Sequence, residues 1–268
     1  MWLLVFIVAM AGVAFIAARL VARRARARAL AAPLPEEALA LLERRVPLYR
    51  ALPPALQPAL QRALQEFLHD KHFVGCGGLA ITDEMRLVIA AQACLLVCAR
   101  PNARYTGFTS VLVYPDAFVV DLVEHDGEVE IQSEETRAGE SWAGGPVILS
   151  WRDVEEGLAV PDDGYNVVLH EFAHKLDDEN ELGEGLPVLR DPAQLESWAR
   201  VLSQEFAALR RGEGCLLDEY GAVSPAEFFA VITEAFFEQG AELAREHPAL
   251  YAELHRYYGL DPARWVRG

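Results

Sequence analysis

The segment VVLHEFAHKLDDEN, residues 167–180, constrains the fold more than any other part of the sequence. It places His170 and His174 four positions apart, with Glu171 directly after the first histidine. On an α-helix, residues at this spacing project from one face, about one turn apart. Two imidazoles so placed can bind one zinc ion, and the glutamate can act as general base toward a water at the metal. The pattern therefore predicts a zinc-binding helix with Glu171 as a catalytic residue.

The residues around this pattern favour a helix buried behind a cleft. Residues 167–169, Phe172 and Ala173 are uncharged, as a buried helix face requires. The preceding PDDGYN offers a turn, with Asp163 and Asn166 as N-cap candidates. Further upstream, the β-rich stretch VILSW could form the edge strand along which an extended peptide aligns. The alternative is a surface helix with two solvated histidines, and the apolar surroundings argue against it.

A hydrolytic zinc site usually has three protein ligands and a water, so a third ligand is expected elsewhere in the chain. Residues 224–239, SPAEFFAVITEAFFEQ, offer Glu227 and Glu234, which are seven positions apart and nearly on one helix face. Ser224 can cap this helix, with Pro225 at its first position. Glu227 is flanked by alanine and phenylalanine, so its carboxylate needs a partner such as a metal. Glu234 is the rival ligand, or an acceptor for a histidine N–H, and spacing alone leaves both open.

The first 30 residues differ from the rest of the chain. Trp2 to Ala18 form an uncharged run of 17 residues, the short end of what spans a bilayer. The five charged residues of this region are all arginines that follow the run, a pattern that keeps the downstream chain in the cytoplasm and is unlike a cleavable signal peptide. The alternative is a buried or lipid-surface helix. We expect a membrane anchor with a basic flank at 1–30, a linker at 31–41, and one domain at 42–268 on the inner face of the cell membrane.

Charge and cysteine content exclude other kinds of site. The net charge of −16 argues against a nucleic-acid-binding surface. Because the first 30 residues carry +5, the remainder carries −21, and the two parts are expected to face different surroundings. The four cysteines form no C-x-x-C pair and no disulfide framework, so a cysteine zinc site is not expected and a reducing compartment fits best.

The pattern of apolar residues predicts an α+β fold with a small central β-sheet and a mainly helical C-terminal half. Strands are expected in SVLVYPDAFVV and GGPVILSW, because both are rich in β-branched and aromatic residues, and VGCGG is expected to be a glycine-rich break. The acidic segment 124–140 between the strands is expected to be a loop or a hairpin. Helices are expected over the H-E-x-x-H segment, at 35–46, 56–71, 82–99, 191–211 and 225–239, and before Pro262.

HEFAHKLDDEN followed by EYGAVSPAEFFAVITEAFF resembles the Mlc titration factor (MtfA) family of bacterial zinc peptidases. Four further blocks resemble that family, RVPLYRALP, GLAITDEMRLVIAAQACLLV, LVYPDAFVV and GESWAGGPVILSW, as does the PAEFFA stretch within the second segment above. The resemblance runs from about Leu42 to about Tyr258. The zinc-binding part is also similar to the catalytic domain of anthrax lethal factor, which shares an HEF-x-H helix and an AEFFA segment.

The resemblance implies a zincin-like metallopeptidase domain with one zinc ion per chain. The family's histidine ligands fall on His170 and His174, and its catalytic glutamate falls on Glu171. Its third ligand, the glutamate of P-A-E, falls on Glu227. A tyrosine seven residues before that ligand is thought to stabilise the tetrahedral intermediate, and Tyr220 stands at that position. A phenol O–H near the metal can donate to the developing oxyanion.

The resemblance also implies a function and a partner. The family's namesake is described as an aminopeptidase that binds and inactivates Mlc, a glucose-responsive transcriptional repressor. A zinc-dependent peptidase is therefore expected here, with a peptide or protein as its substrate. The alternative is a non-catalytic, zinc-containing protein that sequesters a regulator. The best-known members are soluble cytosolic proteins, so the expected membrane anchor is a departure from the family. Asp177, three residues after His174, is a candidate to orient a ligand or to close the helix end.

Overall fold

The computed structural model describes residues 33–265, except 102, 127, 128, 138, 142, 143, 181–183, 190, 214 and 215, together with six isolated positions before residue 33. Over 118–137, 140 and 141 it describes the backbone alone. The expected anchor at 1–30 lies outside the described residues, apart from those six positions. Among the residues that are described, no helix is long and apolar enough to cross a bilayer. The chain divides into two compact units, and the account below concerns the second, Glu37–Gly268.

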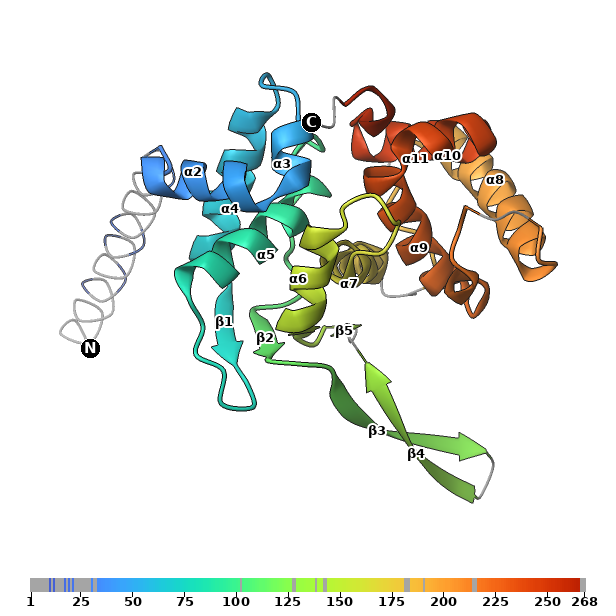
Figure 1. The fold of residues 1–268 in the computed structure, drawn as a ribbon, viewed down its shortest axis with the longest axis horizontal. Helices are drawn as coiled ribbons and strands as arrows, with labels where there is room; N and C mark the ends of the chain where they lie inside the picture. Colours follow the sequence, from blue (N-terminus) through green and yellow to red (C-terminus); the bar gives the residue numbers. More distant parts are fainter. Residues whose placement is uncertain are drawn as a thin grey trace, which may run out of the picture. The chain divides into compact units, whose positions relative to one another are not determined.

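The second unit is mixed α/β and mostly helical, as the sequence predicts (Figure 1). Its helices include α2 (Glu36–Arg45), α3 (Pro47–Ala51), α4 (Gln57–Asp70), α5 (Asp83–Leu95), α6 (Trp151–Ala159), α7 (Val167–Asp177), α8 (Pro192–Arg210), α9 (Pro225–Glu238), α10 (Gly240–Glu246) and α11 (Pro248–Tyr258). All the helices expected from apolar periodicity are present. The sequence did not predict α3, α6 or α10, which have nine residues or fewer and span too few turns to show a clear period.

A four-stranded sheet has the order β1–β2–β6–β5, with β1 (His72–Gly75), β2 (Ser110–Tyr114), β6 (Val147–Ser150) and β5 (Gly139–Ser141). The first three strands are parallel, with Val111 opposite Phe73 on one side and Val147 on the other, while β5 runs antiparallel to β6. A small central sheet is therefore confirmed. The strand β1 was missed, because its last two residues, Val74 and Gly75, belong to the VGCGG stretch that the sequence analysis expects to be a break.

The expectation that VILSW forms the edge of the sheet is wrong. Its residues 147–150 form β6, which hydrogen-bonds to β2 on one side and to β5 on the other. Val147 and Leu149 are fully buried, as suits an interior strand. Trp151 leaves the strand altogether, because the Ser150 side chain accepts a hydrogen bond from the Asp153 N–H and caps α6 there. The edge strands are β1 and β5, and β5, which lies beside β6, comes from the segment expected to be a loop or a hairpin.

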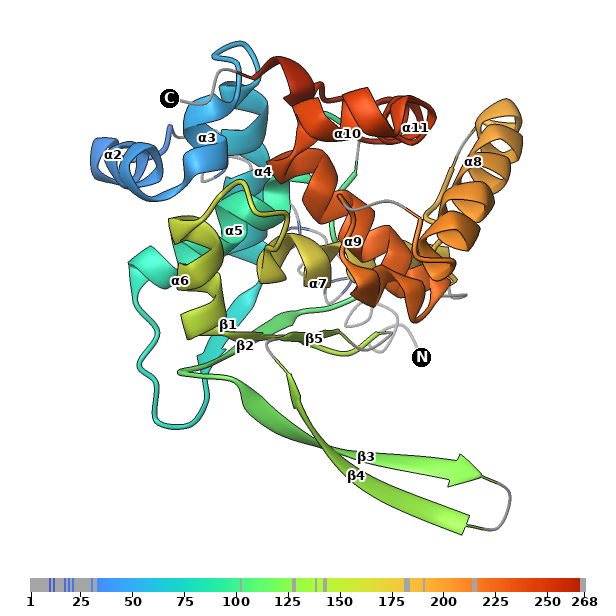
Figure 2. The same cartoon turned by 45° about the vertical axis from the view of Figure 1, so that its right-hand side comes forward.

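The acidic segment between β2 and β5 forms a β-hairpin, one of the two predicted alternatives. Its strands β3 (Phe118–Asp126) and β4 (Val129–Arg137) pair antiparallel and make a separate two-stranded sheet. Figures 1 and 2 show this hairpin as a twisted ribbon distinct from the four-stranded sheet. The stretch SVLVYPDAFVV is therefore two strands rather than one, broken where Pro115 interrupts the pattern.

Helix α7 occupies the centre of this unit, packed against α9, α5 and the strands β5 and β6 (Figure 2). Asn166 caps its N-terminus, since its side chain accepts a hydrogen bond from the Leu169 N–H. Asp163, the other candidate, accepts instead from the Tyr165 N–H in the preceding turn. The apolar face of α7 is fully buried, and the Phe172 ring packs edge-on against the Tyr105 ring at 5.1 Å. Burial on this side leaves the opposite face, with the two histidines, to form a site.

Candidate metal centre

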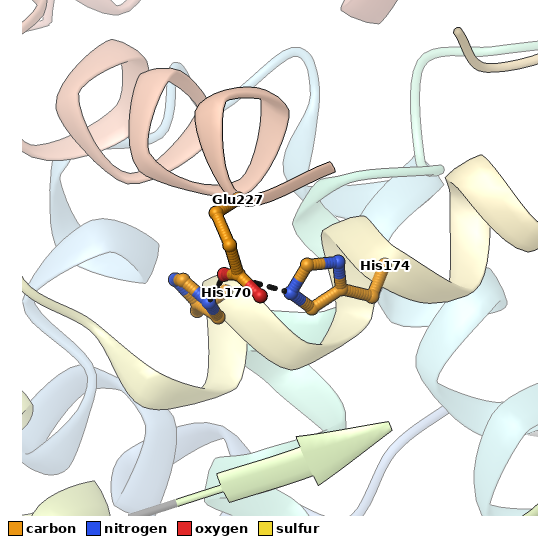
Figure 3. Close-up of side chains that lie close together, drawn as sticks. All are labelled: His170, His174 and Glu227. Carbon is orange, nitrogen blue, oxygen red and sulfur yellow. Dashed lines mark hydrogen bonds and ion pairs between the residues drawn. The ribbon is translucent and has the colours of Figure 1, made fainter. Parts of the chain in front are cut away.

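His170 and His174 lie one turn apart on α7, with their ring centroids 4.9 Å apart. Both rings keep a small exposed fraction, 13% and 15% of the side chain. Figure 3 shows the two rings pointing to the same side of the helix. The predicted i, i+4 geometry is therefore present, on the one face of α7 that the core does not cover.

Glu227 reaches this pair from the first turn of α9. Ser224 caps that helix by accepting from the Glu227 N–H at 3.1 Å, and Pro225 occupies the first turn, as predicted. The Glu227 Oε2 atom lies 3.0 Å from His170 Nε2 and 3.3 Å from His174 Nε2 (Figure 3). One potential ligand atom from each of the three residues falls within 4.8 Å of the others. The cap thus directs one carboxylate at both imidazoles.

Glu234 lies on the other side of His170. Its Oε2 atom is 2.9 Å from His170 Nδ1, and its Oε1 atom accepts the Asn166 N–H at 2.7 Å. Only 3% of the side chain is exposed. Of the two glutamates that the sequence left open, the structure brings Glu227 to both Nε2 atoms, while Glu234 is placed to accept the Nδ1–H of His170. A carboxylate in that position fixes the ring and directs Nε2 toward a metal.

Glu171 is buried beside the histidines. Its Oε2 atom has no hydrogen-bond partner among the described residues. The backbone of β5 comes so close that a Cβ at Gly139 would overlap the Glu171 side chain. Burial raises the pKa of Glu171 to about 7, because desolvation outweighs the two neighbouring imidazoles. A carboxylate with a pKa near 7 can both accept and release a proton at neutral pH.

Tyr220 lies at the rim of the cluster in a short 3₁₀ turn, Glu219–Ala222, that packs on α9. Its backbone N–H donates to Asp218 Oδ1 at 2.7 Å, which holds the turn. The residue is 46% exposed, and its ring centroid lies 6.0 Å from that of His170. The structure therefore brings Tyr220 next to the histidines, on a side that solvent reaches.

The charges of the cluster are strongly coupled. Burial alone would lower the pKa of His170, but the Glu234 and Glu227 carboxylates outweigh it and raise that pKa well above its ordinary value. Burial acts against ionisation of Glu227, yet its hydrogen bonds with both histidines hold its pKa well below the ordinary range. The cluster therefore favours an anionic Glu227 facing a proton on His170. A metal ion would compete with that proton for the Nε2 atom.

Asp177, the candidate for orienting a ligand, contacts neither histidine by a hydrogen bond in the described structure. Its Oδ2 atom accepts the Gly185 N–H at 2.7 Å, and the Leu186 N–H also bonds to this carboxylate. Gly185 has a φ of +72°, and a Cβ there would overlap the carbonyl of Pro225. Asp177 thus ties the segment after α7 to the start of α9, two residues before Glu227.

A buried polar network behind His170 was not predicted. The Asn166 amide donates to Gln92 Oε1 at 2.8 Å and to Glu238 Oε1 at 2.9 Å. Together with the bond from the Asn166 N–H to Glu234, this joins α5, the cap of α7 and α9. All four side chains are almost completely buried. The available sequence signal was the spacing of Glu234 and Glu238, four positions apart on an otherwise apolar helix.

The donor set fits a divalent metal ion. Two imidazole nitrogens and a carboxylate oxygen converge within 4.8 Å of one another, and the buried carboxylate oxygen of Glu171 has no hydrogen-bond partner among the described residues. Borderline cations that prefer nitrogen and oxygen ligands suit such a group. The three residues could therefore hold a metal cofactor.

Comparison with known proteins agrees with this geometry. The profile of a family described as glucose-regulated metallo-peptidase M90 matches residues 20–259. An uncharacterized protein of Synechocystis sp. is 41% identical over 236 residues, which cover 86% of each chain. Mlc titration factor A of Klebsiella pneumoniae is 32% identical over 240 residues (87% of this chain, 88% of the relative), and that of Cronobacter sakazakii is 32% identical over 252 residues (91% and 92%). The resemblance found in the sequence is confirmed: the chain belongs to the M90 family of glucose-regulated metallopeptidases, together with the Mlc titration factor A proteins.

Proposed function

We propose that this protein is a zinc-dependent peptidase whose reaction takes place at His170, His174 and Glu227. The observation that carries the proposal is the approach of both Nε2 atoms to one oxygen of Glu227, beside the buried carboxylate of Glu171. Two histidines and a glutamate, with a position left for water, are the ligands of hydrolytic zinc sites such as those of metalloproteases. We expect one zinc ion per chain in a zincin-like domain.

Each residue then has a defined task. Zinc held by these ligands would supply a Lewis acid for the scissile carbonyl and an acidified water. Glu171 accepts a proton from the attacking water and donates it to the leaving amine, a cycle for which a pKa of about 7 is suited. The Tyr220 hydroxyl donates a hydrogen bond to the oxyanion as charge develops.

The edge strand β5 supports a peptide as substrate. β5 pairs with β6 along one side, and no described strand pairs with its other side. An extended peptide can add to such an edge through main-chain hydrogen bonds. Because Gly139 brings this strand against Glu171, a peptide aligned on β5 would pass close to the proposed base.

The names of the relatives suggest a partner. Because several of them are called Mlc titration factor A, we include in the proposal the binding of a transcriptional repressor of the Mlc type, with cleavage from the amino end of a peptide. A protein that only sequestered a regulator would have no need for a carboxylate buried beside two histidines, so the position of Glu171 favours the enzyme. We further propose that residues 1–30 tether the domain at 42–268 to the cytoplasmic face of the membrane, which cell fractionation with and without residues 1–30 would test.

The test is the substitution Glu171→Gln in the full-length chain. Glutamine keeps the size of the side chain and cannot accept the proton, so zinc content should stay at one per chain while cleavage of a peptide mixture falls by roughly 10²–10⁴-fold. Zinc is measured by elemental analysis and cleavage by mass spectrometry. Tyr220→Phe should also retain zinc, with a lower kcat and little change in KM. Undiminished cleavage by Glu171→Gln would refute the proposed mechanism.

A further inference from the structure

A second cavity, of about 140 Å³, lies where the turn after α5 meets α8, α11 and the segment that precedes α8. Its wall contains none of the residues of the candidate metal centre. The residues that matter for its chemistry are three with polar groups and three with apolar ones: Arg100, Gln194, Tyr257, Pro101, Val188 and Leu189. This volume accommodates several water molecules or a small organic molecule.

Three polar groups of this wall lack a hydrogen-bond partner within the described part of the chain. They are Arg100 Nη1, Gln194 Nε2 and Tyr257 Oη. Gln194 and Tyr257 are 92% and 94% buried, with 8% and 6% of their surface exposed. Buried polar groups are nearly always paired, and each one left unpaired costs about 1–3 kcal/mol. Three in one cavity therefore indicate a missing hydrogen-bonding partner.

The three groups favour a ligand that accepts hydrogen bonds and carries negative charge. Arg100 and Gln194 can only donate through the atoms concerned. Burial raises the pKa of Tyr257 well above its ordinary value, although the neighbouring Arg100 charge acts in the opposite direction, so its hydroxyl also retains a proton to donate. Among the described residues Arg100 forms no ion pair, so no carboxylate in that part of the chain neutralises its charge, and its Nη1 atom has no hydrogen-bond partner there.

The position of Arg100 shows which of its groups remain available. Its Cζ atom lies 4.2 Å from the centroid of the Tyr257 ring, a cation–π contact. This contact places the guanidinium next to the Tyr257 ring, while Nη1 still has no hydrogen-bond partner among the described residues. Such a fixed, planar donor matches the two oxygens of a carboxylate.

We propose that this cavity binds a small aliphatic carboxylate. The carboxylate accepts from Arg100 Nη1, with the Gln194 amide and the Tyr257 hydroxyl as the other donors. The aliphatic part lies against Pro101, Val188 and Leu189. A free short-chain acid and the C-terminal carboxylate of a peptide share this chemistry. The apolar wall disfavours inorganic phosphate, which has no apolar surface to bury.

Isovalerate is the first probe, and its uncharged isostere isovaleramide is the matched control. The full-length chain is titrated with each by calorimetry, in a non-ionic detergent and a buffer free of carboxylates. Isovalerate should bind and raise Tm, because a ligand that binds only the folded state stabilises it. Isovaleramide should do neither. Equal binding of the two compounds, or no binding by any carboxylate probe, would overturn the proposal.

Two substitutions in the cavity and one control outside it test whether isovalerate binds at this site. Arg100→Met removes the charge at similar length and should weaken isovalerate binding at least ~10-fold, as expected for loss of a charge-assisted hydrogen bond. Arg200→Met, at an exposed position of α8, should bind as the parent does. Gln194→Glu places a carboxylate of the chain itself in the cavity, so it should raise Tm without ligand and abolish binding. If Arg100→Met does not fold, Gln194→Glu still tests the proposal. Isovalerate binding that is unaffected by Gln194→Glu would show that the compound does not bind in this cavity.

A second pair of probes distinguishes the two possible sources of the carboxylate, a free short-chain acid and the C-terminus of a peptide. N-acetyl-leucine carries the terminus of a peptide, and N-acetyl-leucinamide lacks its charge. Binding of N-acetyl-leucine that exceeds that of isovalerate identifies a peptide terminus as the ligand, and the reverse order identifies a free acid. Either order of affinities supports a carboxylate site, provided that Arg100→Met weakens the binding of the preferred compound.

Discussion

The two sides of the His170 ring have opposite character. On the ligand side, formed by His174 and Glu227 with the Nε2 atom of His170, the side chains are 13–21% exposed and their polar atoms converge on a small space. On the support side, formed by Glu234, Asn166, Gln92 and Glu238, the side chains are almost fully buried and bonded to one another. One imidazole thus connects an accessible cluster to a closed network.

The difference separates binding from positioning. Groups on the ligand side can exchange a proton or a ligand without disturbing the core, since solvent reaches them. Groups on the support side cannot, because breaking one bond there leaves a buried polar atom unpaired. Substitutions on the ligand side should therefore lower the zinc content and the peptidase activity. Substitutions on the support side should change the affinity for zinc and the stability of the folded protein.

The largest expected effect is the loss of the metal in Glu227→Ala. The Glu227 side chain supplies the carboxylate oxygen of the cluster, whereas the helix cap uses only its backbone N–H. We therefore expect zinc to fall from one per chain to near zero, with peptidase activity lost. The Tm measured in chelator should also fall, because in the metal-free protein the Glu227 carboxylate hydrogen-bonds to both histidines. Elemental analysis and thermal unfolding measure these quantities.

The matched control is Glu196→Ala, which removes an exposed carboxylate of α8. It should leave zinc content, activity and Tm as they are in the parent. If Glu227→Ala retained one zinc at parental affinity, the ligand side would have to be assigned to other residues.

A smaller effect is expected from Glu234→Gln on the support side. The single amide oxygen can still accept from His170 Nδ1, but without the charge that makes the imidazole a better ligand. The amide NH2 then faces the Asn166 N–H, which loses its acceptor, so some loss of stability is also expected. Zinc should remain bound at saturating concentration, with an affinity lower by about 10–100-fold, as is usual for such positioning groups. Competition with a chromophoric chelator measures this zinc affinity. A loss of zinc as complete as in Glu227→Ala would remove the distinction between the two sides.

The ligand side could be predicted from the sequence because its rules are local. The four-residue spacing of His170 and His174, the cap by Asn166 and the Ser224–Pro225 start of α9 all depend on neighbours within one turn. Choosing Glu227 over Glu234 required more, because both carboxylates lie on nearly one face of α9. The resemblance to a family pointed to Glu227, and the packing of α7 on α9 brings it to both histidines.

The support side and the edge strand depend on contacts between distant residues. Asn166 and Gln92 are 74 positions apart, and no sequence period connects them. The three residues of β5 are too few to show the alternation of a strand, and β5 exists because β6 lies beside it. Gly139 carried a usable signal, since a glycine can mark the close approach of backbone to another group.

The subtlest expected effect is on the stability of Glu238→Gln. Burial raises the pKa of Glu238 to about 9, with Glu234 and Asp163 adding to it and the Asn166 amide opposing it. Between the ordinary pKa of 4.5 and this value, the folded state keeps a proton that the unfolded state releases. Stability of the parent should therefore fall as pH rises through that window, because the unfolded state binds fewer protons.

Glutamine keeps an oxygen for the Asn166 amide and does not titrate, so Glu238→Gln should be more stable than the parent by an amount that grows with pH. At about 1.4 kcal/mol per pH unit, the difference should increase by roughly 3 kcal/mol between pH 5.5 and pH 8. Tm values of both proteins at the two pH values measure it, with Glu242→Gln on the surface of α10 as the matched control. A Tm difference that is the same at both pH values would show that Glu238 is ionised in the folded protein, and the support side would then contain a buried charge rather than a neutral network.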